Sequence, residues 1–154
     1  MIADINSLLT GLTSPEEVPL KIVLFGPEST GKSTLAEKLA KAFDTVWNPE
    51  FLRYYLNGKM RQLVEPNTFE IKEDEVINIA IGQVKSELEI VKIEKPVVFL
   101  DTCLHTNLIY ADYYFETIPP ALAKVVAMQN YDLFLFCDTD IPWMPDEQRD
   151  GVEI

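Results

Sequence analysis

The sequence is poor in the residues that build disulfides and metal centres. It contains two cysteines and one histidine in 154 residues. Cys103 and Cys137 lie in or beside apolar runs, which favours reduced, buried thiols over a disulfide or a pair of metal ligands. The single histidine, His105, lies shortly after a predicted strand, and we interpret it as a polar lining or capping residue rather than as a catalytic base.

The sequence also lacks a long apolar segment and an excess of positive charge. No apolar run approaches the roughly 18 residues of a membrane-spanning helix, and residues 1–20 carry acids and prolines instead of a secretory signal. We therefore expect a cytoplasmic protein without a membrane partner. The 25 acidic and 13 basic residues give a formal net charge of −12. Because this charge would repel a polyphosphate backbone, we expect no nucleic-acid partner.

What the sequence does contain is enough for one compact domain. With 154 residues, of which 47% are hydrophobic, the chain can bury about two-thirds of its unfolded surface in a single core. The spacing of apolar residues predicts a short amphipathic helix within residues 1–20, followed by a linker. Residues 21–154 then form the predicted domain.

Short apolar runs alternate with helical patterns along this domain. Strands are predicted at residues 21–25, 45–47, 96–101 and 131–137, and helices from the end of the 26–33 segment to about 43 and at 51–56, 68–94, 108–115 and 120–128. In the longest helix, the predicted apolar stripe consists of Ile77, Ala80, Ile81, Val84, Leu88 and Val91. Because the strands are apolar on both faces, we expect an α/β fold with three layers, in which helices cover both sides of a parallel sheet.

Residues 26–33 form the most specific motif of the chain. They read G-P-E-S-T-G-K-S, which matches the phosphate-loop pattern G-x-x-x-x-G-K-[ST] between a predicted strand and a predicted helix. The motif predicts that backbone N–H groups bind the phosphates of ATP. The expected nucleotide-binding residues are Gly26, Pro27, Glu28, Ser29, Thr30, Gly31, Lys32, Ser33 and Thr34. Lys32 can bridge the outer phosphates, and the Ser33 hydroxyl can ligate Mg²⁺.

Two carboxylates follow strand ends, where parallel sheets bind their ligands. Asp101 ends an apolar strand in the manner of a Walker B residue, and with Ser33 it is the predicted Mg²⁺ ligand. Glu50 follows the second strand, where it could accept the proton of an attacking substrate hydroxyl. The alternative for Glu50 is a residue at a helix start that only complements the helix dipole.

Three further residues are candidates with simpler alternatives. Arg53 could orient Glu50 or bind the substrate, or it could form only a salt bridge with Glu50. Trp143 could cover a planar ring, or it could only pack within a late loop. Arg149 could stabilise charge on the transferring phosphoryl group, or it could be a solvated residue of an acidic loop.

Together these segments resemble the P-loop kinase domain of bacterial NadR-type nicotinamide riboside kinases. The resemblance rests on KIVLFGPESTGKSTL at residues 21–35, NPEFLR at 48–53, VVFLDT at 97–102 and DTDIPWMPDEQRDG at 138–151. It implies a nucleoside-kinase-like fold and ATP-dependent phosphorylation of the 5′-hydroxyl of nicotinamide riboside. It also implies a substrate-side role for Glu50, a metal-side role for Asp101, and nucleoside contacts for Trp143 and Asp146.

The chain also departs from this family. Bifunctional members carry an amino-terminal adenylyltransferase domain, for which residues 1–20 are too short, so we expect the kinase activity alone. Such kinases continue through an Arg-bearing lid helix and a fifth strand, which are missing here before Ile154. Either the sequence is incomplete at this end or the nucleotide site is unusually open, and we expect the former. The alternative function is a P-loop regulatory ATPase without a small-molecule acceptor.

Overall fold

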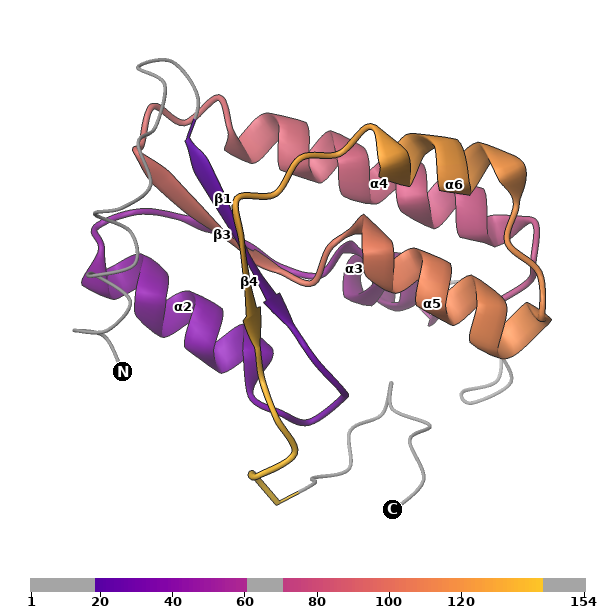
Figure 1. Cartoon of the computed structure of the whole chain (residues 1–154), viewed down its shortest axis with the longest axis horizontal. Coiled ribbons are helices and arrows are strands. Elements are labelled where there is room, and N and C mark those ends of the chain that lie inside the picture. The colour runs from indigo at the N-terminus through magenta and orange to yellow at the C-terminus, as the bar shows by residue number, and fades with distance from the viewer. Residues whose placement is uncertain (1–18, 61–70, 143–154) are drawn as a thin grey trace.

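The computed structural model describes residues 19–60 and 71–142 (Figure 1). Strands and helices alternate as predicted, in the order β1 (Leu20–Phe25), α2 (Lys32–Ala42), β2 (Trp47–Asn48), α3 (Phe51–Met60), α4 (Glu75–Ile90), β3 (Val97–Asp101), α5 (Leu104–Phe115), α6 (Pro120–Ala127) and β4 (Leu133–Phe136). The predicted amino-terminal helix and most of the predicted loop at 138–151 lie outside the described residues.

The four strands form one parallel sheet in the order β2-β3-β1-β4. Leu24 of β1 pairs with Asp101 of β3, and Phe25 pairs with Phe136 of β4. Because all strands are parallel, the loops that follow them lie along one edge of the sheet. β1 and β3 are neighbours in the middle of the sheet. The connection after β1 leads to β2 at one edge strand, whereas the connection after β3 leads to β4 at the other edge strand. The gap between the ends of β1 and β3 is therefore the place where such sheets bind ligands.

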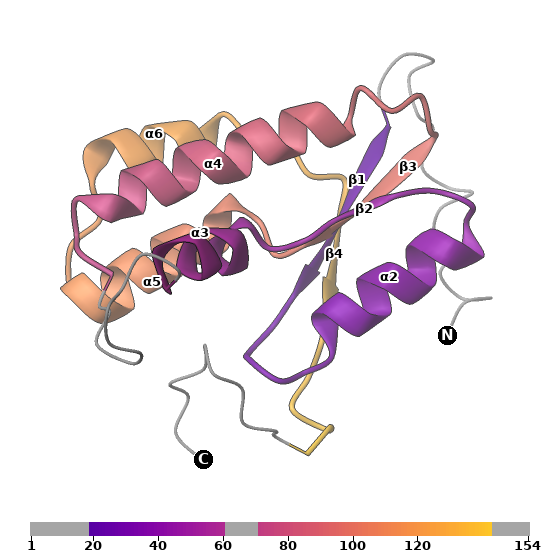
Figure 2. The same ribbon diagram turned by 180° about the vertical axis from the view of Figure 1, so that it is seen from behind.

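Helices cover both faces of the sheet, which confirms the predicted three-layer arrangement (Figure 2). On one face, Ile22 of β1 and Phe99 of β3 belong to a buried cluster with Leu39 of α2. On the other face, Val98 belongs to a second cluster with Ile90 of α4. A third cluster joins α4, α5 and α6. The alternation of side chains along β1 and β3 thus divides them between two cores.

Several element boundaries differ from the predicted ones. α4 begins at Glu75 instead of near residue 68, because residues 73–74 form a turn in which the Glu75 carboxylate accepts a hydrogen bond from the Lys72 N–H at 2.8 Å. α5 begins at Leu104 instead of residue 108, and α3 continues through Gly58 to Met60. The second strand is Trp47–Asn48, shifted from the predicted 45–47.

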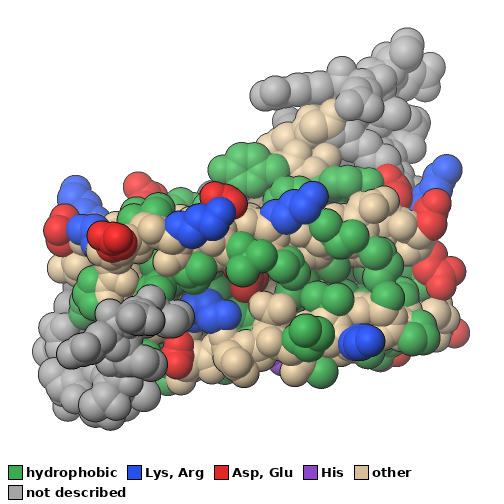
Figure 3. Space-filling model, turned by 90° about the horizontal axis from the view of Figure 1, so that it is seen from above, with side chains coloured by type: hydrophobic (Ala, Val, Ile, Leu, Met, Phe, Trp, Pro, Cys, Tyr) green, Lys and Arg blue, Asp and Glu red, His purple; other side chains and the backbone are tan. Residues whose placement is uncertain are grey.

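The predicted apolar stripe of α4 is confirmed for Ala80, which is buried, and for Ile77, Val84 and Val91, which pack partly buried against the core. It is wrong for Ile81 and Leu88. The residues of α4 that are buried are Val76, Ile79, Ala80, Gln83, Glu87 and Ile90. Ile81 and Leu88 of the predicted stripe are 46% and 56% exposed. Apolar side chains also lie among charged ones on the surface seen in Figure 3. Compared with the prediction, α4 is rotated about its own axis, because two of its polar residues have hydrogen-bond partners inside the molecule.

Those residues, Gln83 and Glu87, form a buried polar network that joins α4 to three other segments. Gln83 Nε2 donates to Glu87 Oε1 at 2.8 Å, and the Tyr131 hydroxyl donates to Glu87 Oε2 at 3.1 Å. The Leu104 N–H donates to the Tyr131 hydroxyl at 3.3 Å, and the Phe51 N–H donates to Gln83 Oε1 at 3.2 Å. Burial raises the pKa of Glu87, and its hydrogen bonds oppose that shift.

Both cysteines are buried free thiols, as predicted. Burial raises the pKa of the Cys103 and Cys137 thiols, which keeps them protonated and unreactive at neutral pH. Among the described residues, none of the helices has the length and apolar character that crossing a membrane requires.

Removing the Tyr131 hydroxyl should destabilise the fold. Tyr131→Phe deprives the buried Glu87 carboxylate and the Leu104 N–H of a hydrogen-bond partner, which costs about 1–3 kcal/mol for a buried polar group. Urea unfolding should show this loss in the free energy of unfolding. The matched variant Tyr113→Phe removes a hydroxyl from a side chain that is 76% exposed and should have an effect within about 0.5 kcal/mol. Equal losses in the two variants would contradict the role of the network.

Candidate functional site

The phosphate-loop motif forms the turn between β1 and α2, at the carboxyl edge of the sheet. Gly26 and Gly31 have positive φ angles of 149° and 77°, a conformation that favours glycine. A side chain at Gly26 would also overlap the carbonyl oxygen of Cys137, just after β4. The Thr30 hydroxyl donates to the Pro27 carbonyl oxygen at 2.9 Å and braces the turn. The two glycines thus permit a loop that other residues would strain.

The loop leads directly into the amino-terminal end of α2. Gly31 is the N-cap, and within this described segment no side chain caps the helix and no acidic residue lies in its first turn. The orphan N–H groups and the positive end of the helix dipole therefore face the loop, where they can bind an anion such as phosphate.

Lys32, the first residue of α2, lies among carboxylates. Its ammonium group donates to the Pro27 carbonyl oxygen at 2.5 Å. Burial lowers the pKa of Lys32, whereas Asp101, Glu50 and Glu28 raise it through their charges. An ammonium group in this position can turn toward the phosphates of a bound nucleotide.

Asp101 ends β3 beside the phosphate loop and is 2% exposed. Burial raises its pKa, and a hydrogen bond with the Ser33 side chain opposes that shift. Its Oδ1 atom is buried without a hydrogen-bond partner among the described residues. A buried carboxylate oxygen of this kind beside a hydroxyl suits Mg²⁺, which prefers oxygen ligands. In the described ranges, no group of three or more His, Cys, Asp and Glu side chains could hold a metal, so Mg²⁺ would need phosphate or water oxygens as well.

Glu50 follows β2 and faces the same cleft. Its side chain is 16% exposed. Burial and then the nearby Asp101 carboxylate raise its pKa to about 6, against the opposing charges of Arg53 and Lys32. Arg53 Nε lies 3.4 Å from Glu50 Oε2, so the salt bridge considered for Arg53 is present. A carboxylate with this pKa is ionised at neutral pH and is a stronger base than an ordinary glutamate.

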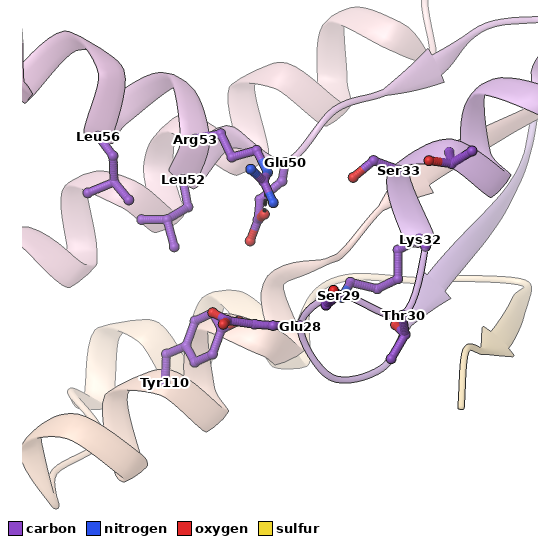
Figure 4. A pocket seen from close by; sticks show the side chains of 12 residues that line it. Glu28, Ser29, Thr30, Lys32, Ser33, Glu50, Leu52, Arg53, Leu56 and Tyr110 are labelled. Carbon is purple, nitrogen blue, oxygen red and sulfur yellow. Dashed lines mark ion pairs between the residues drawn. The ribbon is translucent and has the colours of Figure 1, made fainter. Parts of the chain in front are cut away.

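Glu50 and the phosphate loop are opposite walls of one pocket (Figure 4). Its lining consists of residues 28–34, Glu50, Leu52, Arg53, Leu56 and Tyr110. Figure 4 shows the Glu28 side chain next to Tyr110 of α5, with Glu50 and Arg53 on the α3 side. The structure thus brings residues 28–34 of the predicted loop, Glu50 and Arg53 to one cavity, with Asp101 next to the loop. The predicted residues Gly26 and Pro27 begin the loop but do not line this cavity.

Sequence reasoning missed three residues of this lining. Leu52 and Leu56 are four residues apart in α3, and Leu56 is three residues after Arg53, so this spacing could have placed them on one side of the helix with Arg53. Tyr110 had no such signal, because its position depends on how α5 packs against the rest of the molecule. These three side chains give the pocket an apolar part beyond the phosphate loop.

Four other predicted residues remain to be considered. Trp143, Asp146 and Arg149 lie outside the described residues. The His105 ring packs edge-on against Tyr131 and Phe134, with centroids 5.7 and 5.8 Å apart. Its Nδ1 atom also lies 3.8 Å from the Sγ atom of Cys103, the N-cap residue of α5. The predicted polar lining or capping role of His105 stays a prediction.

Comparisons with known sequences agree with this geometry. The sequence profile of the AAA domain family AAA_28 matches residues 21–153. The trifunctional NAD biosynthesis/regulator protein NadR of Salmonella typhimurium (strain LT2) is 27% identical over 128 residues, which are 83% of this chain and 30% of NadR. NadR of Escherichia coli (strain K12) shows the same identity and coverage. The chain thus spans 30% of the length of these curated relatives.

Solved structures of NadR and of a thymidylate kinase are similar to this chain. A crystal structure of NadR in complex with NR has a TM-score of 0.67 and 27% sequence identity, over 77% of this chain and 33% of that one. NadR in complex with NAD and AMP-PNP has a TM-score of 0.65 at 27% identity, over 77% and 34%. Thymidylate kinase from Ehrlichia chaffeensis shares the fold, with a TM-score of 0.57 at 17% identity over 82% and 74%.

The profile match covers most of the chain, and the parallel sheet with flanking helices agrees with the fold of the solved structures. The chain belongs to the AAA domain family AAA_28 and contains a P-loop kinase domain of the NadR type.

Proposed function

We propose that this chain is an ATP-dependent phosphotransferase that transfers the γ-phosphoryl group to the 5′-hydroxyl of a nucleoside. The observation that carries the proposal is the place of Glu50. This half-buried carboxylate, with a pKa of about 6, faces the phosphate loop across a pocket that continues along Leu52, Leu56 and Tyr110. Binding ATP phosphates uses the loop wall alone, so the opposite wall is available to an acceptor.

Each residue has a role that follows from its place. The loop N–H groups and Lys32 hold the outer phosphates and neutralise their charge. Ser33 and Asp101 would hold Mg²⁺, which when bound supplies further charge neutralisation at the phosphate oxygens. Glu50 accepts the proton of the acceptor hydroxyl, and Arg53 orients Glu50 through their ion pair. Arg149 is the proposed further cation for the transferring group.

Nicotinamide riboside is the first candidate acceptor. The printed ligands of the NadR structures, NR in one and NAD with AMP-PNP in the other, support a nucleoside acceptor and an ATP donor. In this chain, Leu52, Leu56 and Tyr110 would contact the planar base, since apolar and aromatic side chains suit such rings. Trp143 and Asp146 are the proposed further contacts to the nucleoside.

Acceptor-dependent ATP consumption tests this function. The chain is incubated with ATP and Mg²⁺, with and without nicotinamide riboside, beside a panel of other nucleosides. We expect nicotinamide riboside to stimulate ATP consumption above every other nucleoside and to yield the mononucleotide. ATP turnover that is indifferent to every acceptor would instead support a regulatory ATPase.

Lys32→Ala should abolish phosphoryl transfer. The change removes the cation that neutralises the outer phosphates, and loss of such a preorganised group lowers kcat by about 10²–10³-fold. Lys38→Ala, which removes an exposed lysine of the same helix, should leave kcat within about twofold. A Lys32→Ala variant as active as Lys38→Ala would show that the loop does not bind the reacting phosphates.

Glu50→Gln should lower turnover far more than ATP affinity. Loss of a general base lowers kcat by about 10²–10⁴-fold, whereas Glu37→Gln, a surface change on α2, should have no effect. In the wild type, kcat/KM should fall as the pH drops below about 6, because Glu50 then becomes protonated, and this acid limb should be absent from Glu50→Gln. Full activity of Glu50→Gln would make Asp101 the preferred base.

A further inference from the structure

The residue after Glu50 is attached to two consecutive residues of α4. Phe51 begins α3, and its N–H donates to Gln83 Oε1 at 3.2 Å. A side chain at Gly82 would overlap the Phe51 ring, so this ring lies directly on the backbone of α4. We call Gly82 and Gln83 the α4 dock. The dock holds both the main chain and the side chain of the residue next to Glu50.

Glu87 sets the orientation of the Gln83 amide group, because it binds the amide nitrogen while Phe51 binds the amide oxygen. Its Nε2 donates to Glu87 Oε1 at 2.8 Å, and Glu87 also accepts a hydrogen bond from the Tyr131 hydroxyl. A carboxylate only accepts hydrogen bonds, so the amide must present its NH₂ group to Glu87 and its oxygen to Phe51. Gln83 and Glu87 are 2% and 3% exposed, so water is not positioned to take over these hydrogen bonds.

The dock fixes Glu50 relative to the phosphate loop, which the Arg53 ion pair does not do. Arg53 belongs to α3 and would move with Glu50, whereas α4 is anchored to the sheet through Ile90. A second tie to α4 precedes Glu50, since the Ser86 hydroxyl donates to Asn48 Oδ1 at 2.5 Å. Glu50 is therefore bracketed by two attachments to the same helix.

We propose that Gly82 and Gln83 are positioning residues that set the place of the Glu50 carboxylate opposite Lys32. The catalytic consequence rests on the proposed function, whereas the positioning itself does not. A displacement of about 1 Å at a reacting group can lower the rate by about 100-fold, so a loosened dock should slow phosphoryl transfer without weakening ATP binding at the loop.

The test compares Gln83→Met with Tyr55→Phe. The methionine keeps the bulk of Gln83 but leaves the Phe51 N–H without its acceptor and Glu87 without the Nε2 donor. Tyr55→Phe removes another hydrogen bond between α3 and α4, from the Tyr55 hydroxyl to Glu75 at 2.6 Å, which lies away from Glu50. NMR of labelled side-chain carboxyls measures the pKa of Glu50 in each variant, and steady-state kinetics with nicotinamide riboside measure kcat.

We expect Gln83→Met to lower the Glu50 pKa from about 6 toward the ordinary 4.5, because a loosened carboxylate becomes more solvated. It should also lower kcat by about 10–100-fold with an unchanged Kd for ATP, whereas Tyr55→Phe should change none of these quantities. A Glu50 titration in Gln83→Met that equals the wild type would overturn the positioning role.

Gly82→Ala tests the dock by a second route. The added Cβ would overlap the Phe51 ring, so Gly82→Ala should displace Phe51 and lower the stability despite the helix preference for alanine of about 1 kcal/mol. A purely structural role predicts this loss of stability with an unshifted Glu50 titration, whereas the positioning role predicts in addition a shifted Glu50 titration and slower turnover. Shifted titrations in both variants, together with a wild type that no nucleoside stimulates, would support the positioning and reject the proposed function. Unshifted titrations in both variants would reject the positioning whatever the activity.

Discussion

The unfavourable burial of charge at the carboxyl edge of the sheet governs the organisation of this molecule. Lys32 lies among the carboxylates of Asp101 and Glu50, and burial shifts the pKa of each of these groups toward its neutral form. The attraction of Lys32 for the two carboxylates offsets that effect only while the groups stay close. The ends of β1, β2 and β3 must therefore be held in register. A parallel sheet provides this register, because its strands all end at one edge.

The sequence was sufficient for the parts of this arrangement that depend on local physics. The glycines of the phosphate loop adopt positive φ angles, and the motif itself indicates that need. The position of Asp101 at a strand end could be predicted because the apolar run before it identifies a buried strand. That prediction needs no knowledge of the neighbouring strands. Glu50 was placed by the same rule, even though β2 proved to be only Trp47–Asn48. In each case the residues of one continuous segment are enough to predict the position of the functional residue.

The parts that could not be predicted depend on contacts between segments. Counting apolar residues put Ile81 and Leu88 on the buried face of α4, but the helix buries Gln83 and Glu87 in their place. A polar residue can be buried only where partners exist, and here those partners come from the start of α3 and the segment before β4. Tyr110 enters the pocket for a similar reason, because the packing of α5 decides which side chain faces Glu50.

Glu50 opposes folding at the pH where it would act as a base. Its pKa of about 6 in the folded chain exceeds the ordinary 4.5, so the folded state binds this proton more tightly than the unfolded state does. The stability from this group is complete below the ordinary pKa and is lost as the pH rises through about 6. At neutral pH a neutral residue here would stabilise the domain. A base that faces the phosphate loop serves both hydrolysis by water and transfer to a hydroxyl acceptor. The feature that favours an acceptor is therefore the combination of Glu50 with the apolar part of the pocket at Leu52, Leu56 and Tyr110.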